Sequence, residues 1–339
     1  MTKIAINGFG RIGRLFFRQA FTTEGIEIVA INDLGNLENL AYLLKYDTVY
    51  RIFDKEVKTD GENLIVDGKK IKFFQIKEVA DLPWGELGVD IVIESTGVFE
   101  SYEKASIHLK AGAKKVILSA PAKDADGITG QTVLCGINED KITACDLTSN
   151  GSCTTNAVAP IIAVLTENPG IEKAMLNTIH SYTATQSIVD SPVKGNDFRR
   201  GRAAAQNIIP STTGAAISVT RVIKEIDGQF DGIAIRVPSI TGSIADITFL
   251  AKRDVTAEEI NDILRKAATL PRFKGILSVS DEPLVSADII GSPYTSIVDA
   301  QFTKVVSGNL VKVLAWYDNE AGYVSTLLAH TILVAKNIK

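Results

Sequence analysis

Apolar residues near the start of the chain change their period twice within a short stretch. Lys3–Asn7 is an apolar run of strand length, Arg11–Thr22 repeats its apolar residues at helical spacing, and Ile26–Ile31 is again strand-like. A glycine-rich segment, Gly8–Gly13, separates the first strand from the helix. The pattern predicts a strand–helix–strand unit, the repeat from which parallel sheets are built.

Strands and helices continue to alternate up to about residue 150, as in an open doubly wound sheet. A helix is predicted over Ser101–Gly112. The further predicted strands are Lys70–Phe74, Ile91–Glu94, Val116–Leu118 and Val133–Gly136. We therefore expect an α/β fold that begins with a Rossmann-type, doubly wound parallel sheet.

The pattern changes after Ser149. A helix is predicted to begin near Thr154 and to include Pro160–Asn168, and Thr256–Leu270 is an amphipathic helix with Thr256 as its N-cap. The strand-like runs of this part resemble antiparallel strands and are Ala174–His180, Gly232–Val237, Ala245–Leu250, Ser296–Val306 and Leu310–Trp316. The second part is therefore predicted to be an α+β domain with a largely antiparallel sheet.

The length of 339 residues exceeds what one hydrophobic core usually serves, so two domains are expected. We place the first domain at residues 1–150 and the second at residues 151–319. The apolar segment Tyr323–Asn337 predicts a long helix. This C-terminal helix, within residues 320–339, is expected to complete the first domain.

Composition and charge narrow the class of protein. Hydrophobic residues make up 45% and charged residues 22%, and the formal net charge is −4, so neither a nucleic-acid surface nor an anionic-membrane surface is predicted. No metal site is predicted. The first strand begins almost at the first residue, which leaves no room for a signal peptide. The odd number of cysteines, three, fits a reducing, cytoplasmic setting.

The glycine-rich segment has the spacing of a dinucleotide-binding turn. Gly8, Gly10 and Gly13 follow a predicted strand and open a predicted helix, and Asp33 lies 20 residues beyond Gly13. Such glycines let the backbone approach a pyrophosphate, which the helix N-terminus stabilises. Asp33 can accept hydrogen bonds from ribose hydroxyls and would repel a 2′-phosphate, which favours NAD over NADP. The alternative for Asp33 is a solvated turn residue.

Cys153 is the candidate nucleophile, because it lies at the predicted start of a helix. The positive potential there is expected to stabilise a thiolate and to lower the pKa of the thiol. His180 ends a strand and opens a polar segment, so it could activate the thiol and move protons. The alternatives are a small buried hydrophobe for Cys153, a description that also fits Cys135, and a structural hydrogen-bonding role for His180.

With these residues the chain resembles the glyceraldehyde-3-phosphate dehydrogenases. The resemblance extends from Lys3 to Lys336. It is carried, in the family's order, by the segments INGFGRIGR, ESTGVF, SNGSCTTN, HSYTATQ, NIIPSTTGAA, RVP and WYDNEAGY. The resemblance implies oxidative phosphorylation of D-glyceraldehyde 3-phosphate to 1,3-bisphosphoglycerate, with NAD as hydride acceptor, in glycolysis or gluconeogenesis. It also implies a homotetramer.

The resemblance implies a role for each residue that matches a family motif. Cys153 is the implied nucleophile, and His180 the group that activates it. The residues implied to hold NAD are Gly8, Gly10, Arg11, Ile12, Gly13, Asp33, Lys77, Ser119 and Asn319. The residues implied to hold the substrate phosphate or inorganic phosphate are Ser152, Thr154, Thr183, Arg200, Thr213, Gly214 and Arg236. Capping bonds for Ser152, Thr154 and Thr183, and a solvated loop for Arg200, are the alternatives.

Four departures from the family pattern concern the cofactor and the surface. Lys77 stands where arginine is usual near the adenine, Arg51 where glycine is frequent, and Ile217 where lysine is common. Ser191 lies at a position that influences the choice between NAD and NADP.

Three rival functions stay open on the residues alone. They are erythrose-4-phosphate dehydrogenase, which releases the acid, a Cys–His acyl hydrolase without redox chemistry, and a non-catalytic nucleotide-binding protein.

Overall fold

The computed structural model describes residues 1–193 and 195–338, which form two compact units. The first unit comprises residues 1–134, 138–152 and 324–339, of which residue 339 lies outside the described residues. The second unit comprises residues 135–137 and 153–323.

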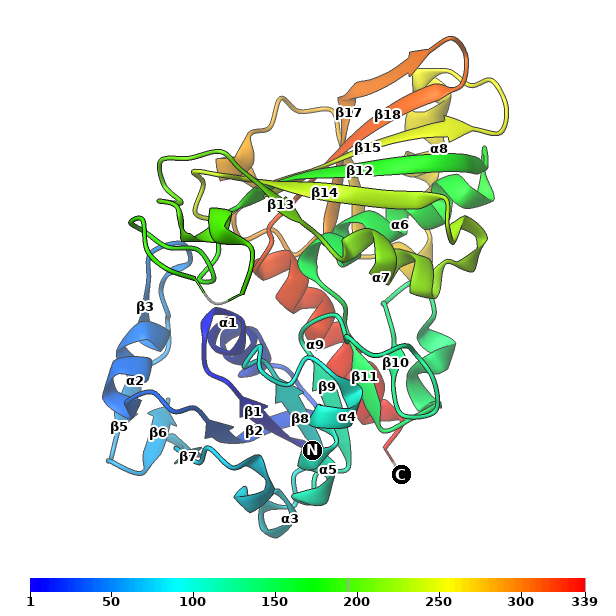
Figure 1. Ribbon diagram of the computed structural model, residues 1–339. Helices are drawn as coiled ribbons and strands as arrows, with labels where there is room; N and C mark the ends of the chain where they lie inside the picture. The colour runs from blue at the N-terminus through cyan, green and yellow to red at the C-terminus, as the bar shows by residue number, and fades with distance from the viewer. Residues whose placement is uncertain (194, 339) are drawn as a thin grey trace. The chain divides into compact units, whose positions relative to one another are not determined.

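Within the described residues, the first unit is built on a sheet of nine strands (Figure 1). Its centre is parallel, because β1 pairs in parallel with both β2 and β8, and within the described residues only the β5–β6 and β6–β7 pairs are antiparallel. The strands, in spatial order, are β10 (Gln131–Thr132), β11 (Leu147–Ser149), β9 (Lys115–Leu118), β8 (Ile91–Glu94), β1 (Thr2–Asn7), β2 (Ile26–Asn32), β7 (Lys69–Phe74), β6 (Asn63–Val66) and β5 (Val57–Thr59).

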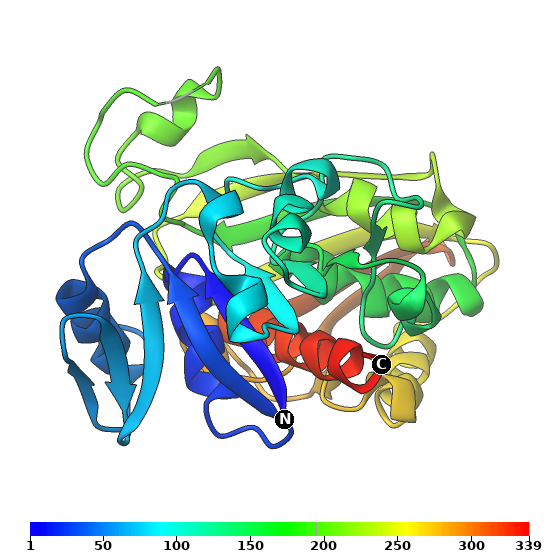
Figure 2. The same ribbon diagram turned by 90° about the horizontal axis from the view of Figure 1, so that it is seen from below.

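Helices and a short hairpin complete the first unit. Helix α2 lies beside the outer strand β5, at one end of the sheet (Figure 2). The remaining elements are α1 (Arg11–Ala20), α2 (Leu37–Lys45), β3 (Tyr46–Asp47), β4 (Arg51–Ile52), α3 (Trp84–Leu87), α4 (Tyr102–Ala105), α5 (Ile107–Lys110) and α9 (Ala321–Lys336), whose first three residues belong to the second unit. The predicted strand–helix–strand start and the long C-terminal helix are confirmed.

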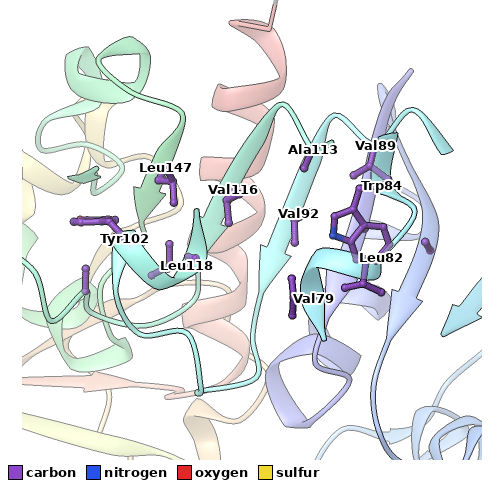
Figure 3. Packing of buried hydrophobic residues seen from close by; sticks show 14 residues of the cluster. Val79, Leu82, Trp84, Val89, Val92, Tyr102, Ala113, Val116, Leu118 and Leu147 are labelled. Atoms are coloured by element: carbon purple, nitrogen blue, oxygen red, sulfur yellow. The ribbon is translucent and has the colours of Figure 1, made fainter. Parts of the chain in front are cut away.

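A core of aromatic and branched side chains lies against one face of the first sheet (Figure 3). Trp84 and Tyr102 are fully buried there, and Val92 of β8 and Val116 of β9 pack with them. Burying an aromatic side chain of this size removes a large apolar surface from water. This cluster fixes α3, α4 and α5 on the sheet and therefore the strand ends beside them.

The second unit is built on a sheet of seven strands. Figure 1 shows α6 (Cys153–Glu167) and α7 (Ala215–Val222) on one face of this sheet. Helix α8 (Ala257–Ala268) is capped by the Thr256 hydroxyl, which accepts from the Glu259 amide at 3.1 Å, as predicted. The strands, in spatial order, are β13 (Ile209–Thr212), β14 (Phe230–Val237), β12 (Ile171–Ser181), β15 (Ser243–Ala251), β18 (Leu310–Tyr317), β17 (Ser296–Val306) and β16 (Leu277–Ser280).

The predicted strand over Val133–Gly136 was wrong, because β10 ends at Thr132. The Val133 amide still donates to the Ser149 carbonyl of β11 at 2.9 Å, but the segment beyond it is held by Asn138. The Asn138 side chain accepts from the Leu134 amide at 2.9 Å and donates to the Thr132 carbonyl at 2.8 Å. The apolar run reflects burial of a turn.

The helix predicted over Ser101–Gly112 is two short helices, α4 and α5, with a break at Ser106. The Ser106 hydroxyl donates to the Glu103 carbonyl at 2.6 Å, a local bond that competes with the helical pattern.

The second sheet is largely antiparallel, but β12 and β14 run parallel to each other. The connection between them passes through β13 and α7, and such a crossover is what parallel neighbours require.

Candidate active site

Cys153 is the first residue of α6, a helix of 15 residues. The chain approaches it through Gly151, whose φ of +65° lies in the left-handed region that favours glycine. At the start of a helix the first backbone N–H groups have no partner within the helix, so negative charge is stabilised there. The fold therefore places a partly buried thiol where a thiolate or an oxyanion can be supported.

His180 faces this thiol from the end of β12. The Nε2 atom of His180 lies 3.3 Å from Sγ of Cys153, which is hydrogen-bonding distance for sulfur. Because β12 and β14 are parallel, their register sets Arg236 directly beside His180. The structure thus brings together three of the residues that the sequence singled out, Cys153, His180 and Arg236.

The other ring nitrogen of His180 has two neighbours. Nδ1 lies 2.7 Å from the Ser181 carbonyl and 2.6 Å from Nη1 of Arg236. Arg236 also donates to the Ser181 carbonyl at 3.1 Å. If Nδ1 carries the ring proton, it donates to the Ser181 carbonyl, and Nε2 is then able to accept the proton of the Cys153 thiol. A bond from Arg236 to Nδ1 instead leaves the proton on Nε2, where it can donate to a thiolate.

Burial sets the resting charge of this pair. Burial raises the pKa of the Cys153 thiol, and the Arg236 charge and the Thr154 hydrogen bonds only oppose that rise. Burial, followed by the Arg236 charge, lowers the pKa of His180 to about 3. The expected lowering of the thiol pKa by the helix start is outweighed by desolvation. Both directions favour the neutral thiol and imidazole over a thiolate–imidazolium pair, so a proton must pass between the two groups during a reaction.

Tyr317 was not predicted, although it lies in the WYDNE segment. Its hydroxyl is 3.0 Å from the Thr154 hydroxyl and 2.7 Å from the Thr178 hydroxyl. Its ring meets the His180 ring edge-on, with the centroids 6.0 Å apart. Tyr317 is fully buried and joins the start of α6 to β12, so it fixes the two elements that carry the thiol and the imidazole.

The residues proposed for phosphate lie on neighbouring segments of the second unit. The Thr183 and Thr185 hydroxyls are 3.0 Å apart, and Nη1 of Arg200 lies 3.4 Å from the Thr185 hydroxyl. Arg200 forms an ion pair with Asp197 at 3.0 Å, so the Asp197 carboxylate partly neutralises the guanidinium charge.

Thr213 and Gly214 precede α7. The Thr213 hydroxyl accepts from the Ala215 amide at 3.2 Å, and Gly214 is the N-cap with no side-chain capping bond. Ser152 directly precedes Cys153 and is partly buried.

Asn319 has a fixed orientation. Its side-chain oxygen accepts from the Gly242 amide at 3.1 Å and from the Ser243 hydroxyl at 3.0 Å. The Thr241 hydroxyl adds a third donor at 3.3 Å. With the oxygen thus committed, the amide NH₂ of Asn319 is the donor that it can offer to another carbonyl.

The glycine-rich turn of the first unit fits a dinucleotide. Gly8 has φ +95°, and a Cβ there would lie 2.7 Å from the backbone of Ser95. A Cβ on Gly13 would lie 2.1 Å from the Gly8 carbonyl oxygen. Gly10 instead opens onto free space and caps α1 without a side-chain bond, so the first amides of α1 can receive a phosphate.

Two acidic side chains contact this segment: Asp33 binds the glycine-rich turn, and Asp47 binds the first residue of α1. Asp33 accepts from the Phe9 amide at 2.6 Å and from the Gly35 amide at 2.8 Å. Each of its carboxylate oxygens keeps a further lone pair for another donor. Arg11, the first residue of α1, forms an ion pair with Asp47.

The other proposed cofactor residues lie on the first turn of α1 and after the strands β9 and β7. Ile12 is partly buried on α1, and the Ser119 amide donates to the Glu94 carbonyl at 2.9 Å. Lys77 is exposed after β7.

Across residues 1–193 and 195–338, no group of three or more histidine, cysteine, aspartate and glutamate side chains could hold a metal ion. Over the same residues, no helix has the length and apolar character needed to cross a bilayer.

A parallel sheet with a dinucleotide-type turn indicates a dinucleotide-dependent dehydrogenase, and the thiol–imidazole pair of the second unit is its candidate catalytic pair. Two family models match the chain: the glyceraldehyde 3-phosphate dehydrogenase NAD binding domain over residues 2–102, and the C-terminal domain of the same family over residues 152–319. The chain belongs to the glyceraldehyde-3-phosphate dehydrogenase family.

Curated relatives agree over nearly the whole chain. A glyceraldehyde-3-phosphate dehydrogenase of Thermotoga maritima is 52% identical over 326 residues, which are 95% of this chain and 96% of the relative. One from Priestia megaterium is 50% identical over 323 residues, covering 95% and 94%. Glyceraldehyde-3-phosphate dehydrogenase 1 of Bacillus subtilis is 48% identical over 336 residues, 98% of each. The expected family, fold class and NAD cofactor are confirmed.

Proposed function

We propose that the chain oxidises D-glyceraldehyde 3-phosphate and phosphorylates it to 1,3-bisphosphoglycerate through a thioester on Cys153. The single observation that carries the proposal is the 3.3 Å approach of the Cys153 sulfur to Nε2 of His180. Erythrose-4-phosphate dehydrogenase and a non-redox acyl hydrolase are not favoured by the family match. NAD, when bound, supplies the hydride acceptor.

Each step assigns one task to a residue of the chain. The Cys153 thiol passes its proton to Nε2 of His180 and attacks the aldehyde carbon, and His180 then returns that proton to the new alkoxide, which completes a hemithioacetal. The amide of Cys153, at the helix start, stabilises the developing oxyanion. His180 then takes the hydroxyl proton as the carbon loses its hydride, and a thioester remains. Inorganic phosphate attacks that thioester, and the thiolate leaves as an acyl phosphate forms.

The two phosphate groups need separate partners. We propose Arg236 and Thr183 for the phosphate of the substrate, because a planar guanidinium fork matches phosphate oxygens. We propose Ser152, Thr154, Thr213 and Gly214 for inorganic phosphate, with Arg200 serving the same region. Support comes from the start of α7, where a Cβ on Gly214 would meet nothing within 4 Å, and from the hydroxyl chain that links Thr183 to Arg200.

Cofactor contacts are proposed in both units. In the first unit they are Gly8, Gly10, Arg11, Ile12, Gly13, Asp33, Lys77 and Ser119. In the second unit, Asn319 would donate its amide to the nicotinamide carboxamide. The chain is proposed to divide into an NAD-binding domain, residues 1–150 with 320–339, and a catalytic domain, residues 151–319.

Asp33 gives a test of cofactor choice. Asp33→Asn keeps an acceptor for the Phe9 or Gly35 amide but removes the charge that repels a 2′-phosphate. Hydrogen bonds to charged groups contribute ~1.5–3 kcal/mol, so the preference for NAD over NADP in kcat/KM is expected to fall by ~10-fold or more. If the preference for NAD over NADP were unchanged, Asp33 would not determine it, and Ser191 would become the candidate residue.

We further propose a cytoplasmic homotetramer. All three cysteines are free thiols, which fits a reducing compartment. In the part of the chain that the structure describes, the face of the seven-stranded sheet opposite α6 carries exposed apolar side chains: Met175 is 56% exposed, Ile233 52% and Leu310 40%. Exposed apolar patches of this kind often mark contacts between proteins.

The reaction is tested by NADH formation from glyceraldehyde 3-phosphate and NAD, with and without inorganic phosphate. Turnover that depends on phosphate and yields an acyl phosphate is expected. Phosphate-independent release of the acid would support the erythrose-4-phosphate type of chemistry. Absence of NADH would overturn the proposal.

A further inference from the structure

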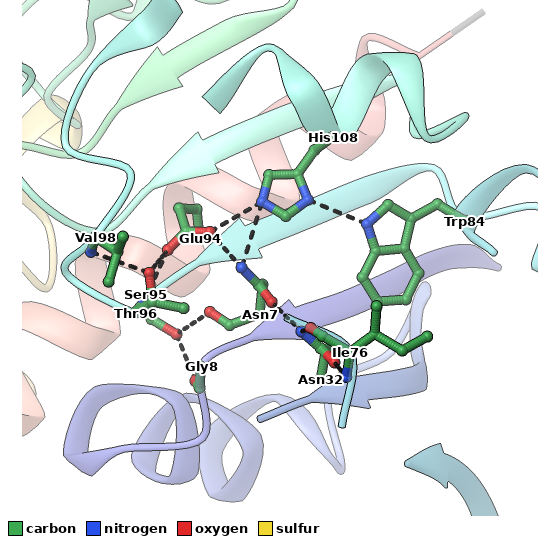
Figure 4. Close-up of polar contacts among 10 residues, drawn as sticks. All are labelled: Asn7, Gly8, Asn32, Ile76, Trp84, Glu94, Ser95, Thr96, Val98 and His108. Atoms are coloured by element: carbon green, nitrogen blue, oxygen red, sulfur yellow. Dashed lines mark hydrogen bonds and ion pairs between the residues drawn. The ribbon is translucent and has the colours of Figure 1, made fainter. Parts of the chain in front are cut away.

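A chain of buried hydrogen bonds crosses the first unit beneath the ends of its parallel strands (Figure 4). The indole nitrogen of Trp84 lies 3.1 Å from Nδ1 of His108, and Nε2 of His108 lies 2.9 Å from a carboxylate oxygen of Glu94. Trp84 and His108 are fully buried, and Glu94 is 4% exposed. None of these three residues belongs to the proposed catalytic or cofactor contacts.

The chain continues across two more strands. Asn7 donates to the same oxygen of Glu94 at 2.6 Å, and Asn32 donates to the Asn7 side-chain oxygen at 2.8 Å. Asn32 also donates to the Ile76 carbonyl at 3.0 Å and accepts from the Ile76 amide at 2.9 Å. We call Trp84, His108, Glu94, Asn7 and Asn32 the strand-end network. It links β8, β1, β2 and the segment after β7.

The hydrogen positions of the network are fixed by chemistry. An indole N–H can only donate a hydrogen bond, so Nδ1 of His108 must accept from Trp84. Nε2 of His108 must then carry the ring proton and donate a hydrogen bond to the Glu94 carboxylate. The other oxygen of Glu94 accepts from the Thr96 amide at 2.8 Å and from its hydroxyl at 2.5 Å. Every partner of Glu94 can donate, which suits a carboxylate. The network therefore has one arrangement, and a break at any link leaves a buried polar group without its partner.

The placement of the network is what points to a role beyond the core. Glu94 itself is followed by Ser95, whose hydroxyl donates to the Gly8 carbonyl at 2.7 Å. Three residues that the network holds directly precede proposed cofactor residues in the sequence: Asn7 precedes Gly8, Asn32 precedes Asp33, and Ile76, the partner of Asn32, precedes Lys77. The loops that would hold the dinucleotide thus share one buried anchor.

We propose that the strand-end network positions these loops as one unit, so that His108 and Glu94 are positioning residues for the cofactor without touching it. The inference rests on the proposed cofactor site in the first unit. A loop held in its bound conformation loses less freedom when the ligand arrives. Loosening the anchor should therefore weaken binding of the cofactor more than it slows the chemistry on Cys153.

The test compares His108→Leu with a matched core variant, Val92→Ala. Val92 is fully buried on β8 in the same region, but it makes no side-chain hydrogen bond. Binding of NAD⁺ to the full chain is measured by isothermal titration calorimetry, and stability by Tm. We expect His108→Leu to raise the Kd by ~10-fold, equivalent to ~1.4 kcal/mol, with kcat at saturating NAD⁺ nearly unchanged. Val92→Ala should lower the Tm and leave the Kd nearly unchanged.

His108→Gln is the rescue variant, because a glutamine can accept from Trp84 and donate to Glu94 at once. It is expected to restore most of the affinity. Equal Kd values for His108→Leu and wild type, or equal weakening by Val92→Ala, would overturn the inference. If His108→Leu does not fold, Trp84→Phe decides: a raised Kd supports the network, and an unchanged Kd overturns it. Failure of wild type to bind NAD⁺ would instead overturn the proposed cofactor site.

Discussion

Arg236 contacts the imidazole and is also the proposed partner of the substrate phosphate, and one substitution can separate these two functions. Arg236→Leu removes the guanidinium whose Nη1 lies 2.6 Å from Nδ1 of His180. That loss affects every aldehyde substrate alike. It also removes the proposed phosphate contact, and a hydrogen bond to a charged group contributes ~1.5–3 kcal/mol, or ~10–100-fold in kcat/KM. Leucine keeps the apolar bulk of β14, so the fold should persist.

The assay is steady-state NADH formation from glyceraldehyde 3-phosphate and from unphosphorylated D-glyceraldehyde. We expect kcat/KM for the phosphorylated substrate to fall ~10–100-fold further than for the unphosphorylated one. The rate of Cys153 alkylation measures the effect on the Cys153–His180 pair without the phosphate contact. Arg253→Leu is the control, because Arg253 pairs with Glu259 at 2.7 Å on the surface. Equal losses on the two aldehydes would refute the phosphate assignment and leave Arg236 with only its contact to His180.

Three further substitutions test the site and its support. Cys153→Ser should abolish oxidation while NAD⁺ binding persists, because a hydroxyl is far less ionised than a thiol. Normal turnover of this variant would rule out Cys153 as the nucleophile. Cys145→Ser is the matched control. Tyr317→Phe removes two hydrogen bonds, so the free energy of unfolding should fall by ~1–3 kcal/mol and alkylation of Cys153 should slow; unchanged values would contradict the bridging role. His330→Gln should flatten the acid dependence of stability. Burial lowers the pKa of His330 to about 3 in the folded protein, whereas an unfolded histidine has a pKa of ~6.5. The stabilisation from neutral His330 is therefore complete above pH ~6.5, and the free energy of unfolding falls by up to ~1.4 kcal/mol for each pH unit below that value. Denaturant unfolding at neutral and mildly acidic pH measures the slope, and equal slopes would contradict this reasoning.

Local patterns were enough to predict most elements of the fold. The strand–glycine turn–helix start, the Thr256 cap and the position of Cys153 at the start of α6 all follow from short-range rules of spacing and capping. The wrong predictions concern segments whose apolar residues are buried without forming the regular strand or helix that the apolar pattern predicts. The run after Thr132 is buried as a turn that Asn138 holds, and apolar character alone cannot distinguish that from a strand.

The site was predictable as a set of residues but not as a geometry. Nothing in the spacing of Cys153 and His180 brings their side chains together; the packing of α6 on β12, which Tyr317 bridges, does so. Burial also reverses the predicted direction of the thiol pKa, because desolvation depends on packing that no motif records. The strand-end network could not be predicted for the same reason, since its members are spread between Asn7 and His108.

The central claim is that oxidation proceeds through a thioester on one thiol, Cys153. Intact-protein and peptide mass spectrometry after mixing the protein with NAD⁺ and glyceraldehyde 3-phosphate, without inorganic phosphate, tests it most directly. The account predicts one 3-phosphoglyceroyl group on the peptide that contains Cys153, formed together with NADH and removed when phosphate is added. NADH formation with no acyl group on Cys153, or an acyl group on Cys135 or Cys145 instead, would contradict it.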